Sequence, residues 1–341
     1  MEPYSNSASA GPSAVLEAAL ADGRCVPIID IDHPAFAVTL ADAELEAQAE
    51  SYERESGPLR ELPPDIRAAL AQSTLGAAVM ASSGTYLKGL PTYVFKLGPE
   101  HLGGFDSPLD RRLAASFPAL TMRIRLQDMV HQLAGGLRAP LRDGDTTRPL
   151  LLANIAGGAA ADGWNTLMHL RRTEPGCLDA RPITIAVFDG DAEGPAFGAA
   201  AVRALKEPGA VLEGLDLEFR HVVYDWSDAG ALERALGGLA AREAICGLSS
   251  EGGLFEYGSD ADIASNLRAF HSASSRGAVV VGSVTHDGER ARRLANRSGA
   301  ATIPRSLAAF SQLASLGGWT VESAIERPFS RHVRLRGLRP S

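Results

Sequence analysis

The residues best suited to chemistry lie in one stretch, from Pro149 to Asp189. An apolar run at 150–155 leads into the small-residue loop Ala-Gly-Gly-Ala-Ala-Ala at 156–161, and a second apolar run at 183–188 ends on Asp189. Glycines let a backbone approach a ligand closely. An acid at the tip of the second strand can accept hydrogen bonds from two ribose hydroxyls. The spacing therefore predicts a site for a nucleotide-type cofactor.

Other reactive groups form no recognised constellation in the sequence. The cysteines, Cys25, Cys177 and Cys246, are far apart, so neither a disulfide framework nor a zinc site is expected. None of the 8 histidines has metal-ligand spacing with another, and no metal is predicted. His286 is considered as a general base, with a surface-loop residue as the alternative. Neither a P-loop nor a G-x-G-x-x-G sequence occurs.

A β-sheet is needed to position these residues, and the sequence contains the pattern expected of one. Apolar runs alternate with helical segments, which favours a parallel sheet with helices on both faces. Two further strands, Trp319–Glu326 and about His332–Arg336, should form an antiparallel hairpin. The predicted fold is a doubly wound, Rossmann-like α/β sheet of five parallel strands plus this C-terminal hairpin. The five expected strands are at 150–155, 183–188, 217–223, 244–248 and 278–284.

The N-terminal part is expected to cover that sheet. We predict a disordered tail at 1–13, a mostly helical lid or substrate domain at 14–147, and the cofactor-binding domain at 148–341. Three local features are predicted within the lid. They are a short helix at 13–21, a helix capped by Asp65 that reaches about Gln72, and a long helix at 109–136 that is broken or kinked at Pro118.

One segment of the lid, 75–102, interleaves tyrosines and lysines with glycine and proline. The interleaved polar residues are Tyr86, Lys88, Tyr93 and Lys96. Two interpretations remain open. The segment forms either two helices whose lysine stems lie along apolar surface, or a lid whose tyrosines and a lysine face a small polar ligand.

Composition and charge exclude several classes of protein. Of the 341 residues, 45% are hydrophobic and 22% charged, as in ordinary globular proteins. The net charge of -8 argues against nucleic acid as the main partner. No apolar run approaches the roughly 20 residues that cross a bilayer. The first residues have neither a basic start nor an apolar core, so no secretory signal is expected and the cytoplasm is the predicted location.

The closing hairpin follows a helix and a Gly-Gly-Trp turn at 317–319. In this it resembles the class I S-adenosylmethionine-dependent methyltransferase family, with a divergent glycine loop. The resemblance covers about Leu150 to Leu335 and rests on the order of the patterns. It implies S-adenosylmethionine as the cofactor and a role in small-molecule biosynthesis. It also implies in-line alkyl transfer, which needs alignment within about 3–3.5 Å more than a strong base.

The resemblance assigns cofactor contacts to individual residues. Asp189 would bind the ribose hydroxyls, with Asp191 as the alternative. Asp225 would bond to the adenine amino group, and Trp226 would pack on the adenine ring. The methionine end would be held by the residues of the glycine turn, Asn154, Ala156, Gly157 and Gly158.

Residues near the sulfonium and the substrate follow from the same resemblance. At the end of the fourth strand these are Ser249, Ser250 and Glu251, with Ser250 on the cofactor side. The candidate catalytic residues are Tyr86, Tyr93, Ser249 and Glu251.

One position departs from the family pattern. The family usually has an acid that contacts the methionine amino group, whereas this chain has Asn154. A neutral amide complements an ammonium less well and can also donate a hydrogen bond. Either the amino acid end is held differently, or the amine is not meant to stay a cation.

Three functions follow as hypotheses. The first is a methyltransferase acting on a small molecule that the lid selects. The second is a cyclase in which the cofactor is itself the substrate: its α-amine attacks its γ-carbon and gives azetidine-2-carboxylate and methylthioadenosine. The third is a non-catalytic cofactor-binding protein, while a nicotinamide dehydrogenase is disfavoured by the loop and the hairpin. No nucleic acid or membrane partner is expected, and a homodimer is considered.

Overall fold

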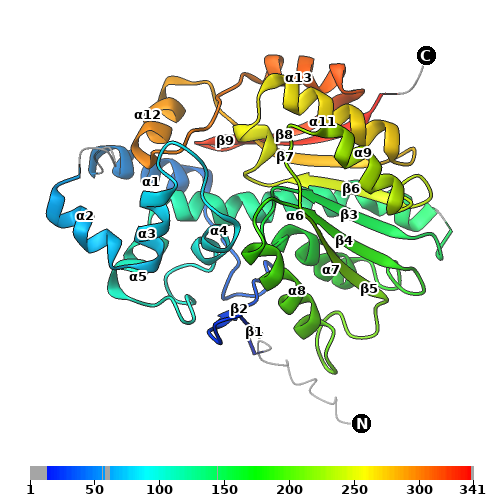
Figure 1. Cartoon of the computed structure of the whole chain (residues 1–341), viewed down its shortest axis with the longest axis horizontal. Helices are drawn as coiled ribbons and strands as arrows, with labels where there is room; N and C mark the ends of the chain where they lie inside the picture. The colour runs from blue at the N-terminus through cyan, green and yellow to red at the C-terminus, as the bar shows by residue number, and fades with distance from the viewer. Residues whose placement is uncertain (1–13, 56, 58–61, 144, 339–341) are drawn as a thin grey trace, which may run out of the picture.

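A seven-stranded sheet forms the centre of the computed structural model, which describes residues 14–338 except 56, 58–61 and 144 (Figure 1). Its strands are β3 (Leu150–Ile155), β4 (Ile183–Phe188), β5 (Leu217–Val222), β6 (Ile245–Ser250), β7 (Val279–Thr285), β8 (Trp319–Glu326) and β9 (Ser330–Gly337). They lie in the order β5-β4-β3-β6-β7-β9-β8. The first five pair in parallel, and β9 pairs antiparallel with both β7 and β8. The predicted fold, five parallel strands plus a hairpin, is confirmed.

Both faces of the sheet are buried. All six residues of β3 are buried, as expected for a central parallel strand covered by helices on both sides. Successive side chains of a strand point to opposite faces. Leu152 accordingly belongs to one hydrophobic cluster and its neighbours Leu151 and Ala153 belong to another. The uninterrupted apolar runs of the sequence are therefore strands that serve two cores.

Helices form a layer on each face (Figure 1). The helices are α1 (Asp42–Glu55), α2 (Pro64–Ala71), α3 (Thr74–Ala81), α4 (Gly89–Lys96), α5 (Pro108–Ala114), α6 (Phe117–Asp143), α7 (Ala161–Thr173), α8 (Glu193–Leu205), α9 (Ala229–Gly238), α10 (Leu254–Tyr257), α11 (Asp260–Ala273), α12 (Glu289–Ser298) and α13 (Leu307–Leu316). Side chains of α6, α7 and α8 fill the first cluster, and those of α9, α11 and α13 fill the second.

The N-terminal part differs locally from the expectation. The predicted helix at 13–21 is wrong from residue 14 onward, because Glu17–Ala19 (β1) pairs antiparallel with Cys25–Pro27 (β2); the rest of that prediction, like the tail at 1–13, lies outside the described residues. Asp65 is not a cap, since α2 begins after Pro63 without a side-chain cap. The long helix at 109–136 is broken rather than kinked. Its break falls just before Pro118, and α6 begins at Phe117.

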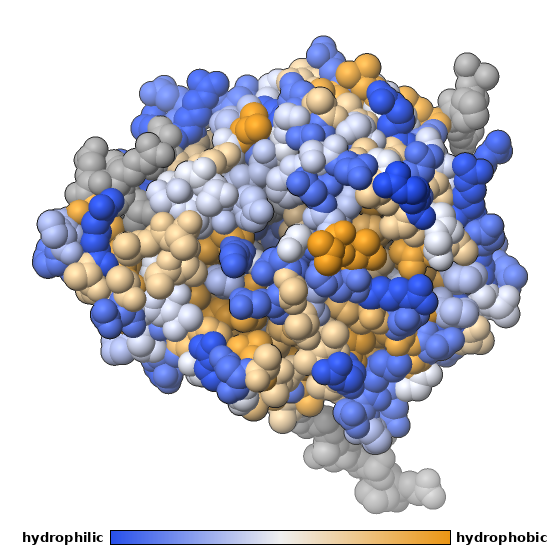
Figure 2. Space-filling view, viewed as in Figure 1, coloured by the Kyte–Doolittle hydropathy of each residue, from blue (hydrophilic) through white to orange (hydrophobic). Residues whose placement is uncertain are grey.

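The N-terminal helices share the first hydrophobic cluster with the sheet. Leu75 of α3 and Val94 of α4 belong to the same cluster as Leu152 of β3. Within the described residues, no helix is both long and apolar enough to cross a membrane. Strongly hydrophobic residues appear on the face shown in Figure 2 as separate spots among hydrophilic ones.

Candidate functional site

The loop after β3 is shaped by backbone rather than by side chains. Ala156, Gly158 and Ala160 have positive φ values of 54°, 55° and 57°, a conformation that costs little only for glycine. A Cβ on Gly157 would lie 1.3 Å from Oδ1 of Asn154. The Asn154 amide therefore occupies the space that a side chain at Gly157 would need, and this position requires glycine.

Asp189 lies at the end of β4 and is held by the glycine loop. Its Oδ2 accepts a hydrogen bond from the backbone N–H of Gly158 at 2.9 Å, and its Oδ1 accepts one from the N–H of Asp191 at 2.8 Å. Burial raises the pKa of Asp189 above its ordinary value, although these two N–H groups oppose the rise. A carboxylate has about four lone-pair sites, so each oxygen can accept a further bond from a ligand.

Asp191 faces the same cavity from the other side of Gly190. Among the described residues, no hydrogen-bond partner is found for its buried Oδ2. Buried polar atoms in folded proteins are nearly always paired, so an exception calls for an explanation. Both acids of the string Phe-Asp-Gly-Asp thus line one cavity, and one of them carries an unsatisfied acceptor.

Aromatic rings form a wall near the end of β5. The ring centroids of Tyr86 and Trp226 are 5.9 Å apart, and those of Tyr86 and Tyr257 are 6.0 Å apart. Asp225 precedes Trp226 and is exposed; its Oδ1 accepts a bond from the N–H of Ser227, which lowers the pKa of Asp225. The wall offers flat apolar surface beside an exposed carboxylate.

The loop, the two acids and the aromatic wall surround one cavity of about 490 Å³. This volume lies within the usual range for small-molecule sites. The cavity is covered by α4, whose Gly89, Thr92, Tyr93 and Lys96 contribute to its lining. The segment 75–102 therefore includes the covering element that one of its two interpretations required.

The end of β6 places three polar residues in different surroundings. Ser249 is buried and accepts a bond from Nδ2 of Asn154 at 2.9 Å. Ser250 is fully buried, with no hydrogen-bond partner found for its Oγ in the described part of the chain. Glu251 alone of the three lines the cavity.

Glu251 is the centre of a buried ion-pair network. Its Oε2 pairs with Nζ of Lys96, and its Oε1 accepts a bond from Nε of Arg125 at 2.7 Å. Glu256 lies 3.5 Å from Arg125. Burial alone would raise the pKa of Glu251, but the charges of Lys96 and Arg125 hold it below its ordinary value. The charges of Lys96 and Arg125 thus balance the charge of the Glu251 carboxylate. The network joins α4 and α6 to the end of β6.

The two candidate tyrosines occupy contrasting positions. Tyr93 is buried, and its hydroxyl donates to the carbonyl of Pro27 at 2.7 Å while accepting from the N–H of Ile29 at 2.8 Å. Burial raises the pKa of Tyr93 well above its ordinary value. Tyr86 is 52% exposed at the aromatic wall. The geometry therefore favours a positioning role for Tyr93 and leaves Tyr86 accessible to a ligand.

Asn154 belongs to a buried polar cluster behind the glycine loop. Its Nδ2 donates to Asp162 at 2.6 Å as well as to Ser249. Burial, reinforced by the charge of Glu251, raises the pKa of Asp162 to about 6. No partner is found among the described residues for Oδ1 of Asn154 or Oδ2 of Asp162. The Asn154 amide thus has an acid beside it, Asp162 in the first turn of α7.

The two acids singled out in the sequence after β4, Asp189 and Asp191, line one cavity, but some residues of its cover were not expected. Gly89 and Thr92 line the cavity. Arg125 binds Glu251, which also lines it. In the sequence, Gly89 could have been singled out by its position. Tyr86 and Lys88 precede it, and Tyr93 and Lys96 follow it. His286 is not among the described residues that line the cavity, and its Nε2 lies 2.9 Å from Oε2 of Glu326.

Comparison with known proteins supports the fold. No protein-family model matches the chain, and no curated protein does. A solved structure, a possible exported protein from Bordetella parapertussis, is 18% identical, with a TM-score of 0.53; the alignment covers 88% of this chain and 98% of that one. The strand order, with five parallel strands followed by an antiparallel hairpin, is that of a Rossmann-like fold.

Solved methyltransferases also appear among the similar structures. The 1,6-didemethyltoxoflavin-N1-methyltransferase of Burkholderia thailandensis, with S-adenosylhomocysteine bound, is 12% identical at a TM-score of 0.41, over 93% of this chain and 96% of that one. The magnesium protoporphyrin IX methyltransferase of Synechocystis PCC 6803 is 13% identical at 0.42, over 65% of this chain and 89% of that one.

Proposed function

We propose that the chain is an S-adenosylmethionine-dependent methyltransferase that acts on a small molecule. The observation that carries this proposal is the acid pair after β4. Asp189 is fixed by two backbone N–H groups, and Asp191 beside it keeps a buried oxygen for which no partner is found in the described residues. A ribose diol offers two hydroxyl donors to such acceptors. The cofactor is therefore a chemical match for the atoms that the site leaves unpaired.

The remaining lining suits the other parts of the cofactor. Gly157 and Gly158 let a ligand approach the backbone after β3, and Trp226 offers a face for the adenine ring. When bound, S-adenosylmethionine supplies a methyl group activated by a positively charged sulfur. The chain then has to align the acceptor, exclude water and stabilise positive charge, for which aromatic faces such as Tyr86 are suited. The lid helix α4 excludes water by covering the cavity.

A calorimetric titration with S-adenosylhomocysteine tests the cofactor assignment. Asp189→Ala should weaken binding by about 1–3 kcal/mol, because ribose hydroxyls are left without acceptors. Asp22→Ala, which removes an acid that is half exposed and distant in sequence from the site, is the control and should bind normally. Unchanged affinity in Asp189→Ala would remove that residue from the site.

Cyclisation of the cofactor is the second candidate, and the Asn154 cluster favours it. The amide nitrogen of Asn154 donates to Asp162 and Ser249, while its neutral oxygen has no partner among the residues that the structure describes. In this reaction the α-amine nitrogen forms a bond to the γ-carbon and the bond from that carbon to sulfur breaks. The electron pair leaves on methylthioadenosine, and the ammonium proton passes to solvent. A neutral amide at Asn154 complements an ammonium less well than a carboxylate would, which assists that step.

Incubation of the purified protein with S-adenosylmethionine alone separates the candidates. Methylthioadenosine together with azetidine-2-carboxylate, detected by mass spectrometry, establishes the cyclase. Intact cofactor combined with a thermal shift favours a methyltransferase, which a screen of small-molecule acceptors then tests. Binding without turnover for every acceptor would leave the non-catalytic alternative. Absence of both product and thermal shift would overturn the cofactor assignment.

We also propose a cytoplasmic location, a homodimer and a domain boundary near residue 148. The cysteines Cys25, Cys177 and Cys246 are free in the structure, which suits the reducing cytoplasm. A homodimer is tested by sedimentation velocity. The lid at 14–147 and the cofactor domain at 148–341 are tested by limited proteolysis, which should cut near residue 148 if the two parts separate.

A further inference from the structure

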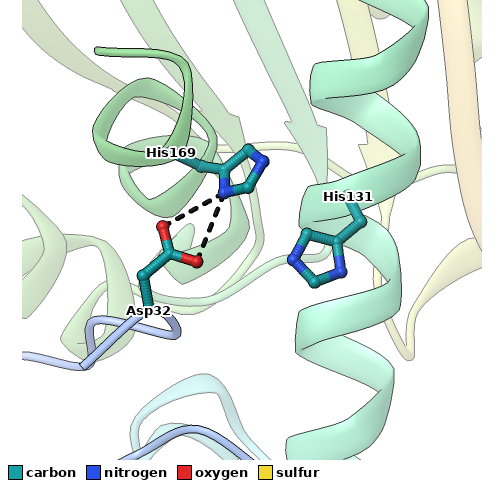
Figure 3. Close-up of side chains that lie close together, drawn as sticks. All are labelled: Asp32, His131 and His169. Atoms are coloured by element: carbon teal, nitrogen blue, oxygen red, sulfur yellow. Dashed lines mark hydrogen bonds and ion pairs between the residues drawn. The ribbon is translucent and has the colours of Figure 1, made fainter. Parts of the chain in front are cut away.

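Two histidines and an aspartate from separate segments meet outside the cavity. Asp32 belongs to the N-terminal arm, defined as residues 28–32, while His131 lies on α6 and His169 on α7 (Figure 3). One ligand atom from each side chain lies within 4.8 Å of the other two. None of the three is among the described residues that line the cavity. The three residues are far apart in the sequence, with 99 positions from Asp32 to His131 and 38 from His131 to His169, so sequence inspection does not reveal the cluster.

The cluster has the geometry of a set of metal ligands. Nδ1 of His169 lies 3.1 Å from Oδ2 and 3.3 Å from Oδ1 of Asp32. Tetrahedral ligands at about 2.0–2.1 Å from an ion are roughly 3.3–3.4 Å apart, so this pair is already spaced to share one. The ring of His131 faces that of His169, with centroids 5.1 Å apart, and one of its nitrogens points toward the other two residues (Figure 3).

We propose that Asp32, His131 and His169 bind a divalent transition-metal ion, with Zn²⁺ as the best match. Two imidazoles and one carboxylate are the protein ligands of three-ligand zinc sites, in which water completes the tetrahedron. The side chains of His169 and Asp32 are 14% and 29% exposed, so water reaches the open position. A bound ion takes the place of the direct contact between His169 and Asp32.

The surroundings favour a cation at this place. Arg172 donates to Oδ2 of Asp32 at 3.2 Å, and it also binds Asp30 at 2.8 Å. Asp30 and Asp32 together outweigh the single charge of Arg172, which leaves a net negative charge for the ion. Arg172 also orients the carboxylate in the way that outer partners orient metal ligands.

The ion would fasten the N-terminal arm to two helices. The arm is already docked on α7, because Asn165 accepts from the N–H of Ile31 at 2.9 Å and donates to the carbonyl of Ile29 at 3.0 Å. Tyr93 of α4 binds the same arm at Ile29. Metal binding at Asp32 therefore stabilises the segment on which the lid helix rests. Its role is structural, and it is independent of whichever reaction the cavity carries out.

Zinc binding by the full chain, freed of metal with a chelator, tests the proposal. We expect one Zn²⁺ to bind in a competition titration with a chromophoric chelator, and the melting temperature to rise with Zn²⁺ concentration. His131→Ala and His169→Ala should each weaken binding at least tenfold and abolish the thermal shift. His271→Ala, at an exposed histidine elsewhere, is the control and should behave as the unaltered protein.

Two outcomes would overturn the site. One is Zn²⁺ affinity that is unchanged in both His131→Ala and His169→Ala, and the other is an equal loss in His271→Ala. His131→Gln and His169→Gln, checked by circular dichroism, ensure that loss of binding is not loss of folding. Co²⁺ provides a spectroscopic check. Its visible absorption bands should appear on binding to the unaltered protein and be absent from both glutamine variants.

Discussion

Gly89 at the start of α4 and Gly158 in the loop after β3 pack backbone against backbone. A Cβ on Gly89 would lie 2.6 Å from the Cα of Gly158, and a Cβ on Gly158 would lie 2.5 Å from the Cα of Gly89. Gly194 of α8 adds a third close approach, since a Cβ on Gly194 would lie 2.9 Å from the Cα of Gly158. The lid thus touches the glycine loop directly, and the same loop donates the N–H that fixes Asp189.

Gly89→Ala should disturb ligand binding through this contact. A methyl group cannot fit between the two backbones, so α4 or the loop must shift, at a cost of about 1–3 kcal/mol typical of overpacking. We expect the affinity for S-adenosylhomocysteine to fall at least tenfold in a calorimetric titration. Gly237→Ala, on α9 with nothing within 4 Å of the added methyl, should leave affinity unchanged. Equal affinity in both variants would show that the contact is not required.

Glu251→Gln should destabilise the protein strongly. Lys96 and Arg125 are buried around this carboxylate, and removing its charge leaves two cations without their common partner. Breaking a buried ion pair costs about 3–5 kcal/mol, measurable by urea unfolding. Glu218→Gln breaks an exposed pair with Arg220 and should have little effect. Similar stability of the two variants would contradict the network's structural role.

Tyr93→Phe distinguishes positioning from catalysis. The variant leaves the carbonyl of Pro27 and the N–H of Ile29 unpaired in a buried place, which should cost about 1–3 kcal/mol of unfolding free energy. Turnover by the folded variant should fall less than tenfold. Tyr86→Phe should leave stability unchanged, since Tyr86 is largely exposed. A loss of turnover above a hundredfold in folded Tyr93→Phe would restore its catalytic assignment.

Asp162→Asn should change the dependence of stability on pH. Burial raises the folded-state pKa of Asp162 to about 6 from 3.8, so the folded protein binds more protons than the unfolded chain between these values. The free energy of unfolding therefore falls as pH rises through this window, by about 3 kcal/mol. Asp162→Asn lacks this contribution. From pH 4 to pH 7, urea unfolding should therefore show the free energy of unfolding of the variant rising by about 3 kcal/mol relative to that of the unaltered protein.

The matched control for that measurement is Asp65→Asn, at an exposed position in the first turn of α2. This variant should keep the full difference between pH 4 and pH 7. If Asp162→Asn keeps it as well, the pKa of Asp162 is not raised in the folded protein, and its part in the Asn154 cluster must be reconsidered.

The sheet and its acid tips could be predicted because their signals are local. The strand β4 is a largely apolar run that Asp189 directly follows, so parallel pairing with β3 brings Asp189 to the glycine loop. The short helix expected at 13–21 fails for the opposite reason. Glu17–Ala19 is a strand only because Cys25–Pro27 pairs with it, and pairing with a partner overrides a weak local preference.

The ion pairs that hold the cover of the cavity could not be predicted from the sequence, because they join residues that are distant along the chain. Glu251 meets Lys96 across 155 positions and Arg125 across 126. Lysine and arginine are usually solvated, so nothing in the residue types predicts that these two are buried. The histidine cluster is hidden in the same way, since metal-ligand spacing along one segment is the pattern that sequence inspection can detect.

The two ends of α4 differ in what holds them down. At Gly89 the helix meets Gly158 through backbone alone, and parting two glycines exposes almost no apolar surface. At Lys96 the helix is held by a buried charge pair with Glu251, whose separation is costly. The end of α4 at Lys96 should therefore be held more firmly than the end at Gly89. A ligand should pass at the glycine edge, beside the acids that receive it.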